Sequence, residues 1–260
     1  MSANKTVPIE ELGKQEYSQI IGYPRITEEE QQNRIAELKK LGVEAVEFRG
    51  QKSIVEMPVL GKGCVGIVLV AHTKTGKAAL KIRRTDADRN EMFHEAEMLT
   101  KSNTVNVGPK LLKTSKNFLL MQLVEGQHFP EWIQKTEPED RNRIISVIRD
   151  VLEQCYRLDE AGLDHGELST APKHIIIDQE DRAYLIDFET SSIERRTANV
   201  TSMCQYLFMG SQTAHIVEEK LGKQDKKQLI KTLREYKQMK TRENFLKVLE
   251  TIFCQKPDGQ

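Results

Sequence analysis

The hydrophobic pattern of this chain of 260 residues changes near its middle, and that change limits the fold more than any other feature. Between residues 43 and 124, short aliphatic runs alternate with turn residues such as Thr73-Lys77, a pattern typical of antiparallel strands. Beyond Glu125-Gly126, apolar residues recur at helical spacing, most regularly from Ile144 to Leu158. The sequence therefore predicts an α+β protein whose first half carries a sheet and whose second half is mainly helical.

The sheet-rich segment is expected to contain five antiparallel strands and one helix. The expected strands cover residues 54–60, 66–72, 78–83, 110–114 and 117–124. The helix is expected over residues 86–101, because Met92 and Ala96 recur on one side of it.

A second helical segment is expected upstream of the sheet. Three glutamates follow Thr27, which is typical of a capped helix N-terminus, and Gly42 ends the apolar periodicity. We therefore divide the chain into an N-terminal helical extension (1–42), a small lobe (43–124) and a large lobe (125–260).

The composition excludes several classes of protein. The chain has 39 basic and 39 acidic side chains, so its formal net charge of zero implies no strongly charged partner. Its longest apolar stretch, Val65 to Ala71, is far shorter than the ~20 residues of a membrane-spanning helix, and Met1 to Glu10 lack the apolar core of a secretory signal. The cysteines are widely separated, which argues against a disulfide framework and a zinc site. We expect a cytoplasmic protein without a membrane partner.

A glycine-rich string, G-x-G-x-x-G, spans residues 61–66. A dinucleotide-binding fingerprint requires a helix directly after such a string, whereas here residues 67–71 continue as a strand. The glycines are therefore expected at the bend of a β-hairpin, where a backbone without Cβ atoms can lie over phosphates. An ordinary hairpin turn is the alternative.

Lys81 lies at the end of an apolar strand. An ammonium group in such a setting is costly unless it is paired, and the next helix offers Glu91, Glu95 and Glu97 as partners. A paired lysine beside a glycine hairpin can bind the α- and β-phosphates of a nucleotide. The alternative is an ordinary surface lysine.

The order of these features resembles the protein-kinase fold, which has a glycine loop, a lysine on its third strand and a helix-C glutamate matched by Glu95. His-Gly-Glu-Leu at 165–168 and Asp-Phe-Glu at 187–189 stand where that family has His-Arg-Asp-Leu and Asp-Phe-Gly. The combination is similar to the small atypical kinases: the RIO-type, Kae-associated and lipopolysaccharide-kinase-like groups, and especially the compact archaeal predicted Ser/Thr kinases. The resemblance covers about residues 50–205 and implies a two-lobed fold.

The resemblance also implies roles for individual residues. Lys81, paired with Glu95, would orient the phosphates of ATP, Asp187 would hold Mg²⁺ or Mn²⁺, and Glu167 would accept or orient the substrate hydroxyl. Gln122 and Val124 would belong to the hinge, whose backbone groups would pair with the adenine edge. Packing within the sheet is an equally good explanation of these side chains. The nucleotide-binding residues that the resemblance implies are Gly61, Gly63, Gly66, Val68, Lys81, Glu95, Gln122 and Val124.

Two residues depart from the family pattern. Glu167 replaces an aspartate, so its carboxylate is one methylene longer. The metal-binding asparagine would fall at Pro172; if two residues are inserted here, His174 takes its place as a metal ligand, although histidine is a poor ligand for Mg²⁺. The neighbouring Lys173 could lend a positive charge to the transferred phosphate.

Two further residues are expected to support this loop. His165 is expected to brace the metal-binding motif rather than to transfer a proton, because that is the family's use of it. Asn199 could begin the helix that carries a buried aspartate in large kinases, and would replace that aspartate.

The favoured function is an ATP-dependent phosphotransferase, an atypical Ser/Thr protein kinase that acts on a protein substrate. A small-molecule kinase of the same fold is one alternative, and a nucleotide-binding pseudokinase or scaffold is another, prompted by Glu167 and the missing asparagine. The basic segment 220–247 is interpreted mainly as solvated helix faces. A ribonucleoprotein client is a further hypothesis for its partner.

Overall fold

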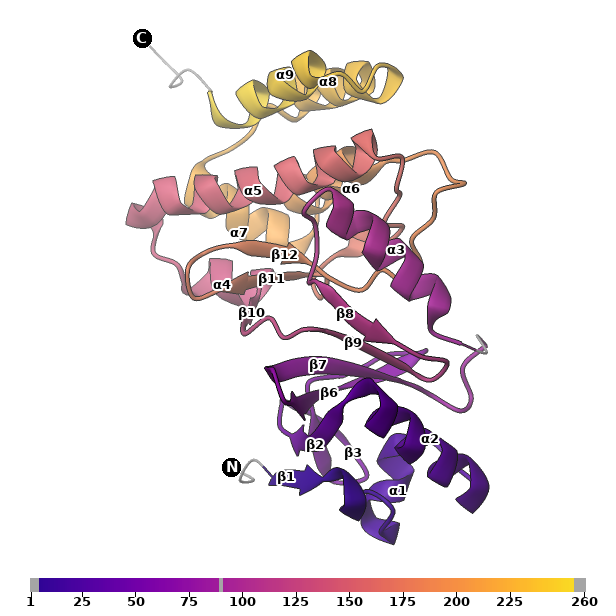
Figure 1. Cartoon of the computed structure of the whole chain (residues 1–260). Helices are drawn as coiled ribbons and strands as arrows, with labels where there is room; N and C mark the ends of the chain where they lie inside the picture. The colour runs from indigo at the N-terminus through magenta and orange to yellow at the C-terminus, as the bar shows by residue number, and fades with distance from the viewer. Residues whose placement is uncertain (1–4, 89–90, 255–260) are drawn as a thin grey trace. The chain divides into compact units, whose positions relative to one another are not determined.

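The structure is a computed structural model that describes residues 5–88 and 91–254, and the chain forms two compact units (Figure 1). One unit comprises the residues up to Thr100 together with Pro109–Leu123. The other comprises Lys101–Gly108 together with the residues from Val124 onward. The predicted α+β class is confirmed, because the first unit is built on an antiparallel sheet and the second is mainly helical.

The sheet of the first unit has seven strands among the described residues, two more than the sequence predicts. Its order is β1-β2-β6-β7-β9-β8, and β5 pairs with β6. All of these pairings are antiparallel. The strands are β1 (Lys5–Pro8), β2 (Val43–Phe48), β5 (Gly61–Lys62), β6 (Gly66–Thr73), β7 (Gly76–Arg83), β8 (Leu111–Thr114) and β9 (Phe118–Gln122).

The predicted strand 54–60 is wrong. Strands β3 (Lys52–Ile54) and β4 (Met57–Val59) form a separate hairpin instead. The two residues between them, Val55 and Glu56, have φ values of 46° and 64°. Hairpin turns with two positive φ angles usually contain Gly or Asn, so these residues give no turn signal in the sequence.

Residues 5–42 contribute to the sheet as well as to its covering helices. Sequence analysis predicts only helices here, but β1 pairs with β2 and forms the edge of the sheet. The helices that follow are η1 (Ile9–Glu11), α1 (Gln15–Ile21) and α2 (Glu28–Leu41). The predicted cap of α2 is confirmed, since Thr27 Oγ1 accepts from Glu30 N at 3.2 Å and Gly42 has φ 81°.

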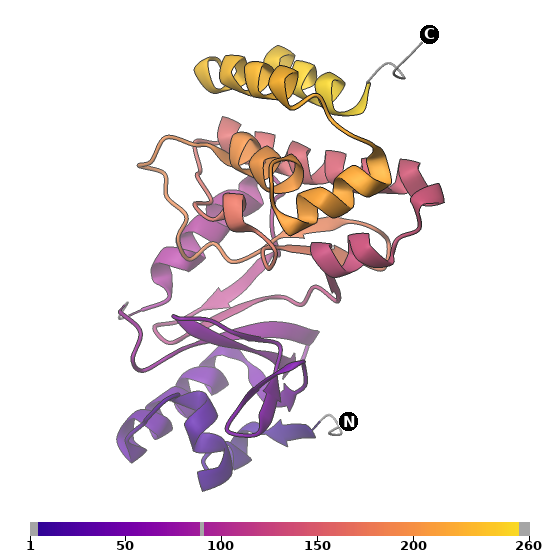
Figure 2. The same cartoon turned by 180° about the vertical axis from the view of Figure 1, so that it is seen from behind.

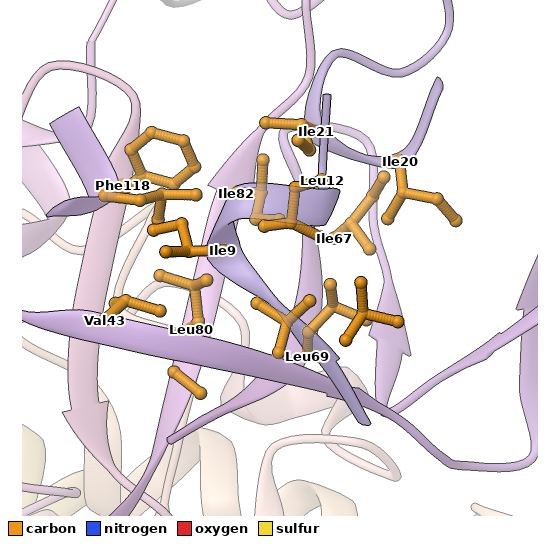
Figure 3. Packing of buried hydrophobic residues seen from close by; sticks show 14 of the residues in the cluster. Ile9, Leu12, Ile20, Ile21, Val43, Ile67, Leu69, Leu80, Ile82 and Phe118 are labelled. Atoms are coloured by element: carbon orange, nitrogen blue, oxygen red, sulfur yellow. The ribbon is translucent and has the colours of Figure 1, made fainter. Parts of the chain in front are cut away.

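One face of the sheet packs against these N-terminal helices (Figure 3). Side chains alternate between the faces of a strand. The even residues Leu80 and Ile82 of β7 therefore join the apolar cluster, together with Ile67 of β6 and Phe118 of β9. Lys81, between Leu80 and Ile82, must point to the opposite face.

Helix α3 (Phe93–Thr104) begins later than the predicted residue 86. Before the helix, the backbone bonds elsewhere, because Arg84 N donates to Val65 O at 2.8 Å and Met92 N to Lys116 O at 3.0 Å. The hydrogen bonds of the helix therefore begin only after Met92, whose carbonyl oxygen accepts from Ala96 N.

The second unit combines helices with a three-stranded sheet. The predicted hairpin is present as β11 and β12, and β10 pairs with β11. Helices α8 and α9 lie side by side in both views (Figure 2). The elements are β10 (Gly126–His128), α4 (Phe129–Lys135), η2 (Pro138–Asp140), α5 (Arg141–Glu160), η3 (Leu168–Thr170), β11 (Ile175–Asp178), β12 (Ala183–Leu185), α6 (Asn199–Phe208), α7 (Gln212–Leu221), α8 (Lys226–Gln238) and α9 (Arg242–Phe253).

Helix α5 is the longest described helix, and one of its faces is buried. Ile144, Val147, Val151 and Cys155 recur at intervals of three or four residues and are at most 1% exposed. This periodicity explains why the helix could be predicted from the sequence. Among the described residues, no helix is both long enough and apolar enough to cross a membrane.

Candidate active site

Lys81 and Glu95 form a buried ion pair in the first unit. Lys81 Nζ lies 2.9 Å from Glu95 Oε1, and the two side chains are 7% and 5% exposed. Lys81 lies opposite Val68 on β6 and Leu119 on β9, on the face away from the N-terminal helices. The structure thus selects Glu95 from the three acidic residues that the sequence offered to Lys81.

Gly66 allows the lysine side chain to lie where it does. A Cβ atom at this position would come 3.0 Å from Lys81 Cγ and 3.1 Å from Lys81 Cε, which is tighter than most real contacts. A larger residue would therefore push the ammonium group away from Glu95. Gly63 N donates to Gly66 O at 2.8 Å and closes the hairpin, while Gly61 lies within β5.

The remaining predicted nucleotide-binding residues lie on β6 and at the end of β9. Val68 faces both Lys81 and Gly61 across the sheet. Gln122 N donates to Lys110 O at 2.8 Å, and Gln122 Oε1 accepts from Lys110 N at 3.2 Å. The backbone N–H and the side-chain oxygen of Gln122 are therefore both bonded to Lys110 at the end of β9. Val124 is the first residue of the second unit after β9.

Glu167, His174 and Asp187 come together within the second unit. His174 Nε2 lies 3.3 Å from Glu167 Oε2, and one potential ligand atom from each of the three residues lies within 4.8 Å of the others. Carboxylate oxygens and an imidazole nitrogen form a donor set that a divalent cation accepts. The residues present therefore fit the cation that the resemblance implies. The sequence analysis predicted His174 and Asp187 as metal ligands and did not place Glu167 with them.

Asp187 has a strained backbone conformation. Its φ is 69°, in the left-handed region that residues other than glycine seldom adopt. The residue before it, Ile186, donates its amide to His174 O at 3.0 Å, which joins the end of the hairpin to the loop that carries His174. Strain of this kind is concentrated at functional sites, so this observation favours a functional Asp187.

His165 braces the loop from a fully buried position. Its Nε2 lies 3.1 Å from Ile186 O and must be the donor, because a carbonyl oxygen only accepts. Its ring lies 4.9 Å from the Phe188 ring and 5.6 Å from the His174 ring. Burial, and then the charge of His174, lower the pKa of His165 to about 4. A neutral imidazole held in this way is suited to support rather than to proton transfer.

Gly166 is required by the shape of the same loop. Its φ is 93°, and a Cβ atom there would lie 3.0 Å from Thr190 O. The arginine that the kinase family has at this position would not fit without a change of backbone. Arg195 occupies part of the space and donates to Thr190 O at 2.6 Å and to Asp164 at 3.0 Å.

A buried network that sequence analysis missed lies behind the loop. Asn199, the predicted first residue of α6, accepts from His165 N at 2.9 Å and donates to Asp159 Oδ1 at 2.9 Å. Tyr236 of α8 donates to Asp159 Oδ2 at 2.9 Å. Asp159 follows Cys155 by one helical turn on the buried face of α5, and an acid at such a position was the available signal.

Two other residues singled out in the sequence are exposed. Lys173, next to His174, has an exposed side chain. Cys64, at the tip of the glycine hairpin, is an exposed free thiol. Cys155 and Cys204 are buried and unpaired, in agreement with the predicted absence of a disulfide framework.

Comparison with known proteins gives partial matches. A scan of protein-family models gives no match. The chain is 33% identical to the KEOPS complex subunit Bud32 of Pyrococcus abyssi over 112 residues, which are 42% of this chain and 46% of that protein. It is 26% identical over 102 residues to the uncharacterized protein MJ1211 of Methanocaldococcus jannaschii, which are 39% of this chain and 84% of that protein.

A longer match is to a named kinase. The chain is 26% identical to the serine/threonine-protein kinase PknH of Mycobacterium bovis over 144 residues, 52% of this chain and 24% of that protein. The chain thus spans less than half the length of both Bud32 and PknH. Together with the sheet-bearing and helical units, these similarities support a place for this chain in the protein-kinase-like superfamily.

Proposed function

We propose that this protein is an ATP-dependent phosphotransferase that transfers the γ-phosphate of ATP to a Ser or Thr hydroxyl of a protein. The observation that carries the proposal is the buried Lys81–Glu95 pair. A buried ion pair contributes little net stability, because desolvation of both charges offsets their attraction. Its presence beside the glycine hairpin is therefore better explained by a function, and binding of nucleotide phosphates is the function that it fits.

Lys81 supplies a fixed positive charge for those phosphates. Glu95 holds the ammonium group in one place and supplies the opposite charge that a buried ammonium group needs. Gly66 leaves room for the lysine side chain. The three residues belong to one unit and form a ready-made site for an anion.

Asp187 and His174 supply the metal-binding part. They would hold a divalent cation, which when bound would neutralise charge on the phosphate oxygens. The strained backbone of Asp187 and the bond from Ile186 N to His174 O keep these side chains in one place without a cation. His165 fixes the same segment through Ile186 O.

Glu167 is the proposed acceptor of the hydroxyl proton. Its side chain is 36% exposed, so a substrate can reach it, and His174 restrains its longer side chain at 3.3 Å. Glutamate is one methylene longer than the aspartate of the kinase pattern, and this contact holds its carboxylate near Asp187. Lys173 is exposed next to this pair and could add a positive charge.

A nucleotide-binding pseudokinase is the second candidate, and the same contact favours it. If Glu167 remains bound to His174, no base accepts the hydroxyl proton. Such a protein would bind ATP and be stabilised by it, in proportion to the logarithm of ligand concentration over Kd, without transferring phosphate.

The test is incubation of the full chain with γ-labelled ATP and either Mg²⁺ or Mn²⁺, with a mixed protein acceptor. Asp187→Asn should reduce transfer by about 100-fold or more, because the cation loses a carboxylate ligand. Asp140→Asn is the matched control, since the Asp140 side chain is 50% exposed and lies 3.6 Å from Arg143 in a surface ion pair. It should retain wild-type activity.

Product analysis separates the candidate functions. Phosphoserine or phosphothreonine in the acceptor supports the proposal. Label found only in a small molecule would indicate a small-molecule kinase. Nucleotide binding with no transfer by the wild type, in either metal, would reject the enzyme and favour the pseudokinase.

A further inference from the structure

Tyr23, in the N-terminal segment, contacts one cation within the glycine hairpin and another just after β7. The ammonium of Lys62, within the hairpin, lies 3.2 Å from the Tyr23 hydroxyl and 4.8 Å from the ring centroid. The guanidinium of Arg84, just after β7, lies 5.0 Å from the same ring centroid. Cations are attracted to the faces of aromatic rings, so one side chain from outside the hairpin holds both.

The backbone around Tyr23 is itself fixed. Thr85 N donates to Tyr23 O at 2.8 Å, and Thr85 Oγ1 donates to Arg25 O at 2.8 Å. Arg34 of α2 is fully buried and donates to Ile21 O at 2.8 Å and to Arg83 O at 2.7 Å. These hydrogen bonds connect the N-terminal segment to the end of β7 and the residues that follow it, and they fix the backbone on both sides of Tyr23.

Arg84 carries this restraint into the glycine hairpin. Its amide donates to Val65 O at 2.8 Å, and its Nη1 donates to Gly63 O at 3.0 Å. Its other nitrogens, Nε and Nη2, donate to the two oxygens of Asp86 at 2.8 and 2.6 Å. Three of the five N–H groups of this guanidinium are used in these bonds, which restrain the backbone of the hairpin at Gly63.

We propose that Tyr23, together with Arg84, is a positioning residue that holds the glycine hairpin 61–66 ready to bind the phosphates of the nucleotide. This inference rests on the proposed function. Glycine-rich segments lose more conformational freedom than others when they become ordered. A hairpin that is already restrained loses less of it on binding, so nucleotide affinity increases.

The first test needs no nucleotide. Hydrogen exchange of the full chain should be faster at the Gly63 and Arg84 amides, whose bonds close the hairpin, in Tyr23→Leu than in the wild type. Tyr23→Phe, which keeps the ring and loses the hydroxyl, should show an intermediate rate. Arg84→Lys keeps the charge but cannot bind Gly63 O and Asp86 together, and should also exchange faster.

The second test measures MgATP. Tyr23→Leu removes one hydrogen bond and two cation–π contacts. It should raise the Kd for MgATP and the KM for ATP by about fivefold to tenfold, with little change in kcat. The control is Lys14→Ala, since Lys14 also lies in the N-terminal segment but pairs with the exposed Glu11. It should change neither the exchange rates nor the affinity.

The outcomes separate this inference from the proposed function. Faster exchange together with weaker MgATP binding supports it. Unchanged exchange at residues 61–66 in Tyr23→Leu overturns it, and so does faster exchange with unchanged nucleotide affinity. A wild type that binds no nucleotide overturns the proposed function instead, and the exchange rates then still decide whether Tyr23 restrains the hairpin.

Discussion

Two pairs, each of a basic side chain and a carboxylate, are proposed to act in the reaction, and they differ in burial and in their relation to the kinase pattern. Lys81 and Glu95, in the first unit, are of the residue types that the resemblance implies, lie 2.9 Å apart and are 7% and 5% exposed. His174 and Glu167, in the second unit, both depart from that pattern, lie 3.3 Å apart and are 12% and 36% exposed. The pair proposed to orient the nucleotide thus has the expected residue types, whereas the pair proposed to meet the metal and the substrate does not.

The difference in burial has an energetic meaning. A carboxylate that reaches water loses little when its partner is removed, because solvent replaces the contact. A carboxylate as buried as Glu95 has no such replacement. The first pair should therefore matter for folding as well as for binding, and the second mainly for chemistry.

The largest effect is expected from breaking the first pair. Lys81→Met should lower the free energy of unfolding by about 3–5 kcal/mol, because Glu95 is left buried without its main partner. Urea denaturation of the purified chain measures this loss. The double variant Lys81→Met/Glu95→Leu should recover most of it, since an apolar pair replaces the stranded charge.

The corresponding change in the second pair provides the comparison. His174→Leu should cost less, because the Glu167 carboxylate that it leaves is partly in water. Lys247→Met, in an exposed pair with Glu243, controls for removal of a surface cation. Equal losses for Lys81→Met and His174→Leu would refute the distinction between the two pairs.

The next largest effect concerns pH and the imidazole beside the second pair. The pKa of His165 is about 4 in the folded protein, mainly because of burial. In the unfolded chain it is near its ordinary value of about 6.5, so the unfolded state binds more protons between these values. Stability should therefore be complete above about pH 7 and fall by about 3 kcal/mol as the pH decreases to 4.

Denaturation of the wild type and of His165→Gln across this pH range measures the effect. The variant should be less stable at pH 7 and show a flatter dependence between pH 6.5 and 4, since it lacks the titrating group. His174→Asn should make the wild-type slope shallower, because removal of the His174 charge raises the pKa of His165. A wild-type slope that His165→Gln leaves unchanged would show that another group titrates.

The features that could be predicted from the sequence are those set by neighbouring residues. The cap of α2, the hairpin of β11 and β12 and the buried face of α5 each depend on spacings of a few residues. The helix that follows the strand offered three acidic partners for Lys81, and the resemblance singled out Glu95 among them. These local patterns predicted the fold class, and the resemblance predicted the roles of the site residues.

The features that could not be predicted depend on contacts between distant parts of the chain. Tyr236 binds Asp159 across 77 positions, and Thr85 binds Tyr23 across 62. No spacing rule connects such residues. Strand β1 was missed for the same reason, because a four-residue segment with one buried side chain becomes a strand only when β2 pairs with it.

A smaller effect is expected from changing the length of the acidic side chain in the second pair. Glu167→Gln should reduce phosphotransfer by about 100-fold, the usual contribution of a general base, with little change in the KM for ATP. Glu167→Asp should lose less, because it keeps the carboxylate but moves it away from His174. Glu180→Gln, at a 66% exposed acid, is the control. If Glu167→Gln retains full activity, Glu167 is not the base.

The smallest effect concerns the choice of cation, which the first pair cannot influence. His174 offers an imidazole nitrogen where the kinase pattern has an amide oxygen, and nitrogen ligands favour Mn²⁺ relative to Mg²⁺, which prefers oxygen. His174→Asn should therefore weaken Mn²⁺ binding by about threefold to tenfold while Mg²⁺ competes better.

Titration of Mn²⁺ followed by electron paramagnetic resonance measures the affinity directly, with and without a non-hydrolysable ATP analogue, and does not depend on activity. His215→Asn, at an exposed histidine of α7, is the matched control and should bind Mn²⁺ as the wild type does. If His174→Asn also leaves Mn²⁺ affinity unchanged, His174 is not a ligand. Its contact with Glu167 would then be a second ion pair like that of Lys81 and Glu95, and the contrast between the two pairs would reduce to burial alone.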